Sequence, residues 1–118
     1  MSAMNTITRT LSASGVSTGI KVNGPSRQGT YANSLLAPGI LVSLSSGASL
    51  TYQIEVTGDD IYTPGYNPAT GNWVPFTGMA GLTASAANTL GAAVAAIRVN
   101  VTAYTSGTLT FQFVQVTE

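Results

Sequence analysis

The C-terminal segment that decides the fold reads Ala95-Ala96-Ile97-Arg98-Val99-Asn100-Val101-Thr102-Ala103-Tyr104-Thr105-Ser106-Gly107-Thr108-Leu109-Thr110-Phe111-Gln112-Phe113. Apolar and polar residues alternate on both sides of Thr105-Ser106-Gly107, which is the pattern of half-buried strands. A three-residue loop with Gly107 in the left-handed conformation puts both apolar sets on one face. The sequence therefore predicts a β-hairpin with the pairs Ala103–Leu109, Val101–Phe111 and Val99–Phe113.

Further short strands separated by turn residues extend this prediction along the chain. We expect them at residues 6–11, 18–22, 39–45, 49–57 and 72–76. In the fourth of these, Leu50, Tyr52, Ile54 and Val56 share one face. Residues 39–45 allow two registers, with either Ile40, Val42 and Leu44 or Leu41 facing the core. The first is favoured because it buries more apolar surface.

The connections between these strands are less regular. Residues 23–29 and 58–72 are rich in Gly, Pro and Asn and predict loops. Residues 81–96 carry apolar side chains at helical spacing, but Asn88, Thr89 and Gly91 interrupt them, so we expect a loop with a short helical turn as the alternative. The fold class that follows is all-β: an antiparallel, jelly-roll-like sandwich of seven to eight strands. Residues 1–118 form one domain, with residues 1–15 as a candidate N-terminal arm.

Composition argues against an enzyme. The chain has no Cys and no His, which removes disulfides, Ser-His and Cys-His nucleophile pairs, thiolate metal sites and most zinc sites. The only clustered acids are Glu55, Asp59 and Asp60. A calcium site or a glycosidase pair is one interpretation of them. The favoured interpretation is a turn in which Asp59 and Asp60 hydrogen-bond the backbone. We expect no catalytic residues, no metal and no cofactor.

Charge is the least usual property of the chain. Only four basic and four acidic residues are present, 7% of the sequence, and the net charge is zero. Large uncharged areas on a surface of about 6,000 Å² favour association, so we expect a homo-oligomer. A hydroxyl-rich surface, with 29 Ser and Thr residues, is the simpler alternative. No basic patch is available for nucleic acid, and no secretory signal or membrane span is expected.

Aromatic residues gather around the long connection. Tyr62, Tyr66 and Trp73 flank turn-forming Pro and Gly residues, where they can anchor a protein interface or stack on sugar rings. The alternative is that Trp73 fills the core and the tyrosines lie at its rim. The candidate interface residues are Tyr62, Tyr66, Trp73, Arg9 and Arg27.

Four segments together suggest a family. They are residues 6–11, 49–60, 72–76 and, most strongly, 96–108, which reads Ala-Ile-Arg-Val-Asn-Val-Thr-Ala-Tyr-Thr-Ser-Gly-Thr. In this order they resemble small virion proteins of tailed bacteriophages.

The resemblance implies a head decoration, or cement, protein on the outer surface of the capsid, assembled in the host cytoplasm. Its partners would be the major capsid protein and two further copies of itself in a trimer. Residues 1–15 or the loop at residues 24–29 would reach a neighbour. The alternative, from another class, is a glycan-binding or structural module of a tail fibre or spike, which would use Tyr62, Tyr66 and Trp73 as a stacking platform.

Overall fold

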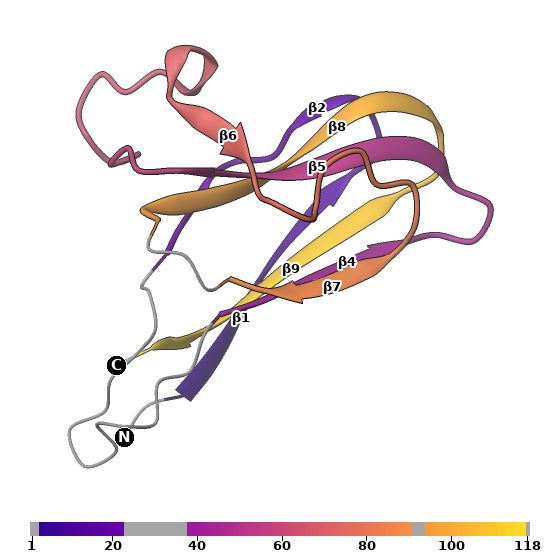
Figure 1. The fold of residues 1–118 in the computed structure, drawn as a ribbon, viewed down its shortest axis with the longest axis horizontal. Coiled ribbons are helices and arrows are strands. Elements are labelled where there is room, and N and C mark those ends of the chain that lie inside the picture. Colours follow the sequence, from indigo (N-terminus) through magenta and orange to yellow (C-terminus); the bar gives the residue numbers. More distant parts are fainter. Residues whose placement is uncertain (1–2, 23–37, 91–93, 118) are drawn as a thin grey trace.

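The computed structural model describes residues 3–22, 38–90 and 94–117, which form nine strands in two antiparallel sheets (Figure 1). Sheet A contains, in spatial order, β1 (Ala3–Leu11), β9 (Leu109–Thr117), β4 (Gly39–Leu44) and β7 (Ala86–Thr89). Sheet B contains β2 (Gly15–Val16), β8 (Ala96–Ser106), β5 (Ser49–Thr57) and β6 (Trp73–Pro75), and β3 (Ile20–Lys21) also pairs with β8. The predicted all-β sandwich is confirmed.

The order of the strands is that of a jelly roll. β2 and β3 lie along the same side of β8, opposite Asn100–Val101 and Ala96–Ile97 respectively, so they are two parts of one interrupted strand. With these two counted as one, the described residues form eight strands, and the chain changes sheet at every connection except β5 to β6. This is the double-sheet arrangement in which neighbours along the chain mostly face each other across the core.

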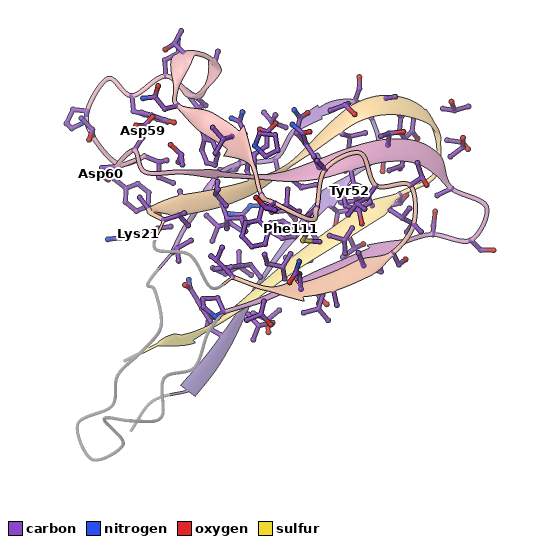
Figure 2. All side chains as sticks on the ribbon, viewed as in Figure 1. Lys21, Tyr52, Asp59, Asp60 and Phe111 are labelled. Carbon is purple, nitrogen blue, oxygen red and sulfur yellow. The ribbon has the colours of Figure 1, made fainter. Side chains whose placement is uncertain are left out.

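The core lies between the sheets and is built from the alternating apolar residues of both (Figure 2). Tyr52 from sheet B and Phe111 from sheet A are both fully buried there. The Tyr52 hydroxyl donates to the Ala84 carbonyl at 2.7 Å, so the one polar atom of this buried side chain has a hydrogen-bond partner. Burial raises the pKa of Tyr52 above its ordinary value. As predicted, Leu50, Tyr52, Ile54 and Val56 share the inner face of β5, and Ile40 and Val42 face the core while Leu41 is exposed.

The predicted hairpin at residues 97–113 is wrong. Both strands exist, but β8 pairs in sheet B and β9 pairs in sheet A, so neither of them is the other's neighbour. The turn at Gly107, whose φ is 100°, carries the chain across the core instead of along one sheet. Two strands that face each other across a core bury alternate residues just as two paired strands do. The alternation in the sequence therefore could not distinguish the two arrangements.

Ala103 is a second correction on the same strand, because it is exposed rather than buried. The pairing of β5 with β8 slips by one residue between Thr51 and Tyr52, which is a β-bulge. Beyond the bulge, the side chain that faces the core is that of Tyr104, which is partly buried. A bulge shifts the alternation by one, so every side chain beyond it changes face.

Three inter-sheet turns stack at one end of the sandwich. They connect β1 to β2, β4 to β5 and β8 to β9. Leu11 and Leu44 both lie opposite Leu109, one on each side. Two hydrogen bonds join Ser45 and Thr108, since Ser45 N–H donates to the Thr108 carbonyl and Thr108 N–H donates to Ser45 Oγ, both at 2.9 Å. The turn after β4 is consequently bonded to the turn before β9 at this end.

Other predictions had mixed outcomes. The strand around Trp73 is confirmed as β6, and the first strand is β1, which pairs with β9 along its whole length, so residues 3–11 belong to the sandwich. Where a loop or a short helical turn was expected, residues 86–89 form the strand β7 (Ala86–Thr89). The loop at residues 24–29 and Arg27 lie outside the described residues. Within the described residues, no helix is long and apolar enough to span a membrane.

Candidate functional site

The long connection between β5 and β6, at the upper left of Figure 1, is closed at its base by Asp59, and Asp60 supports a turn within it. Asp59 accepts hydrogen bonds from the Asn72 backbone at 2.8 Å and from its side-chain amide at 3.1 Å. These bonds, of which the one from the Asn72 backbone has the largest effect, lower the pKa of Asp59 below its ordinary value. Asp60 accepts from the Tyr62 backbone N–H at 3.0 Å. The prediction that both acids serve a turn is confirmed.

The closed loop brings the three candidate aromatic residues into one pocket. Tyr62, Tyr66 and Trp73 line a cavity of about 420 Å³, a volume within the range of small-molecule sites. The remaining wall is formed by the segment between β1 and β3, by the loop and by β8; its residues are Val16, Ser17, Thr18, Gly19, Ile61, Pro68 and Arg98. Trp73 lies outside the core cluster of the described residues, so it belongs to this surface rather than to the core.

Trp73 is held in place on two sides. Its indole N–H donates to the Tyr66 hydroxyl at 2.7 Å, and the Arg98 guanidinium lies over the ring at 4.2 Å from its centroid. The second contact is a cation–π interaction. Gly71 makes room for the bonded pair, because a β-carbon there would overlap the Tyr66 hydroxyl and would lie 3.0 Å from Trp73 Nε1. The aromatic wall is therefore formed before any ligand arrives.

Beneath Trp73 lies a buried polar network on the outer face of sheet B. Arg98 Nε donates to Glu55 Oε1 at 2.8 Å, and Asn100 Nδ2 donates to Glu55 Oε2 at 2.8 Å. Burial on its own raises the pKa of Glu55, but the hydrogen bonds from Asn100, Gln53 and Arg98, together with the Arg98 charge, outweigh it and leave the pKa lowered. Glu55 is therefore ionised, and it neutralises Arg98.

Glu55, Asp59 and Asp60 bond to different parts of the protein. Glu55 is engaged by Arg98 on sheet B, whereas Asp59 and Asp60 bond the loop. In the part of the chain that the structure describes, no group of three or more acids, histidines or cysteines could hold a metal ion.

Arg9 lies on the opposite sheet from the pocket aromatics, yet it reaches the pocket wall. It is opposite Phe111 on the inner side of the edge strand β1, and its Nε donates to the Thr18 carbonyl at 3.4 Å. An inward-pointing charge of this kind protects an edge strand from pairing with another chain.

Sequence reasoning missed Arg98 and Asn100, because their roles depend on the register between β5 and β8 that places them opposite Glu55 and Gln53. The only signal in the sequence is that all four are polar residues at alternate positions of two strands.

The outer face of sheet A is a second candidate surface, and it has the opposite character. The register of its four strands places eleven residues with described side chains on it, with no ionisable side chain among them: Thr6, Thr8, Thr10, Gly39, Leu41, Ser43, Ala87, Thr89, Thr110, Gln112 and Val114. We call this set the uncharged face. All its members are exposed or half-exposed.

Comparison with known proteins gives no further assignment: no protein-family model, no curated protein and no solved structure matches the chain.

Proposed function

We propose that this chain is a structural virion protein of a tailed bacteriophage that binds the assembled capsid as a decoration protein. The observation that carries the proposal is the uncharged face of sheet A. Depletion of charge distinguishes the core of a protein interface from the rest of a surface, and here it extends over all four strands of a sheet. The resemblance of residues 96–108 to small virion proteins points in the same direction.

The positions of the ionisable side chains among the described residues support this assignment, because these side chains lie away from the uncharged face. Arg98 and Glu55 neutralise each other on the other sheet, Asp59 and Asp60 close a loop, and Arg9 points inward. None of them protects the uncharged face from association. A monomer that displayed such a face in solution would tend to associate, so a partner that covers it is the physical reason for its composition.

The size of the face favours several linked copies, and the resemblance to decoration proteins makes a trimer the expected oligomer. Four strands spaced by about 4.8 Å and roughly 20 Å long give an area of about 400 Å². That is about half of what one partner contributes to an interface of standard size. Three linked copies would present about 1,200 Å² to the lattice, and each copy would bind at the raised effective concentration that linkage provides.

The mechanism is linkage between binding and capsid stability. A protein that binds the assembled lattice but not the dissociated subunits stabilises the lattice by RT ln(1 + [L]/Kd) for each site. Many sites on one shell add up, so weak individual contacts suffice to resist the pressure of packaged DNA. No catalytic group is needed.

The test is a copy count with charge variants. Mass spectrometry of purified particles that carry the gene should find this chain at a fixed ratio to the major capsid protein, with hundreds of copies in each particle. The variant Thr8→Lys puts a charge on the uncharged face, halfway along its edge strand β1, and should abolish binding to particles. Thr102→Lys, an exposed threonine on a strand of sheet B, is the matched control and should bind normally. Particles that lack the chain, or a Thr8→Lys variant that binds as well as the control, would disprove the proposal.

A further inference from the structure

We infer that the pocket on sheet B is a binding site for a neutral saccharide. The pocket belongs to the sheet opposite the uncharged face, so the inference does not depend on the proposed capsid contact. It rests on three properties of the wall: exposed aromatic faces, a balance of charge, and hydroxyl groups close to those faces.

The aromatic faces suit the C–H side of a sugar ring. The N–H of Trp73 is already bound to the Tyr66 hydroxyl and Arg98 lies over one face of the ring, so the indole can offer a ligand only the apolar surface of its other face. Tyr62 is 68% exposed at the mouth of the pocket. The Lys21 ammonium lies 5.7 Å from the centroid of its ring. A large exposed aromatic residue next to a fixed one gives a stacking surface at small entropic cost.

The charge of the wall excludes an ionic ligand as the natural occupant. Among the described residues that line the pocket, Arg98 is the one that carries a charge, and its guanidinium is paired with Glu55 at 2.8 Å. Lys21 and Asp60, whose charges are of opposite sign, both line a neighbouring hollow (Figure 2). An anion would have to compete with Glu55 for Arg98, whereas a neutral ligand leaves that ion pair intact.

Hydroxyl groups complete the site. Tyr66 accepts from Trp73 and keeps its own O–H to donate, and the Thr18 side chain is exposed on the wall. A small-ligand site is usually lined by apolar groups with a few polar groups among them. A purely hydrocarbon ligand would leave these hydroxyls without partners, while the hydroxyls of a sugar would bond to them.

The single tryptophan of the chain lies in the pocket and provides a direct readout. The full chain is titrated with maltotriose, cellotriose, chitotriose and mannotriose while Trp73 fluorescence is followed, and a neutral glycan array widens the search. We expect saturable binding of at least one sugar with a Kd between about 10 μM and a few mM.

Tyr62→Ala should weaken that binding at least about tenfold, and its exposure means that the fold is not affected. Leu41→Ala, which removes an exposed apolar side chain from the uncharged face, is the matched control and should bind as the original chain does. Circular dichroism checks that both variants are folded.

A proline-rich decapeptide is titrated in parallel, because aromatic grooves also bind such segments. Binding of the peptide but of no sugar, an empty array, or equal sugar binding by Tyr62→Ala and the original chain would each overturn the inference.

Discussion

Gly107 lies where the structure departs most from the sequence-based prediction, and its replacement by alanine tests the new arrangement. In a hairpin, the side chain of a turn residue points to solvent, and a methyl group there would cost only backbone strain. In the inter-sheet turn between β8 and β9, a β-carbon on Gly107 would lie 2.6 Å from Ala48 Cα and would also meet the Ala48 methyl and Ser45 Oγ. Ala48 belongs to the neighbouring turn between β4 and β5.

The magnitude has two parts. Alanine at a φ of 100° costs about 1–3 kcal/mol of strain. Overlap with the backbone of the neighbouring turn adds about 1–3 kcal/mol, because the sheet ends must separate to relieve it. We therefore expect Gly107→Ala to lower the free energy of unfolding by about 2–6 kcal/mol, a large share of the 5–15 kcal/mol of an ordinary domain.

Gly47→Ala is the matched control. Gly47 also has a positive φ, 76°, but a β-carbon there would have no atom within 4 Å. Only strain of about 1–2 kcal/mol is expected. Urea denaturation followed by Trp73 fluorescence measures both variants. With an m-value of about 2 kcal/mol/M, a difference of 2 kcal/mol separates the two midpoints by about 1 M. Equal midpoints would show that Gly107 does not contact the neighbouring turn, and the stacked arrangement would be refuted.

Three further predictions concern the core, the polar network and the pocket wall. Phe111→Ala, at a fully buried position, should cost about 3–5 kcal/mol in the same denaturation experiment, and a cost below 1 kcal/mol would contradict its place in the core. Since the pKa of Glu55 is lowered on folding, its contribution to stability is complete above the ordinary glutamate pKa and is lost as the pH falls through the lower folded-state value. Glu55→Gln should flatten the acid side of the stability profile, and an unchanged profile would argue against the ion pair with Arg98. Tyr66→Phe removes the acceptor for the Trp73 N–H, so it should cost about 0.5–1.5 kcal/mol and shift the fluorescence maximum, whereas an identical emission spectrum would exclude that hydrogen bond.

The faces of individual strands could be predicted from the sequence, because burial follows the period-2 alternation wherever no bulge interrupts it. Ile40 and Val42 turn inward and Leu41 outward as expected, and the same holds for the four apolar residues of β5. The alternation failed at Ala103, where a bulge of one residue moved the side chain to the other face. Bulges depend on pairing with a partner strand, which a single strand's sequence does not contain.

Strand pairing was harder to predict for a related reason. A turn such as Ser46-Gly47 or Ser106-Gly107 is compatible with a hairpin and with a crossing to the other sheet, since both bury the same residues. The strand at residues 86–89 was missed because it lies at the edge of sheet A and carries small side chains, Ala86 and Ala87, that give little β-signal.

The candidate site was predicted in part. Clustering of Tyr62, Tyr66 and Trp73 follows from their nearness along the chain, and the loop closed by Asp59 keeps them together. The Arg98 that supports Trp73 comes from a strand far along the sequence, and only the register of β5 against β8 brings it there.

The jelly roll by itself selects neither proposal, because viral capsid proteins and lectins both use this architecture. The distinction comes from what each sheet leaves on its outer face once the shared core is filled. Sheet A leaves threonines and small apolar residues without charge over four strands, which suits a broad protein contact. Sheet B leaves a neutralised ion pair beneath a fixed tryptophan, which suits a small neutral ligand. Since the core separates the two faces, a protein bound to a lattice through sheet A would keep the pocket open, and the two proposed activities are compatible in one chain.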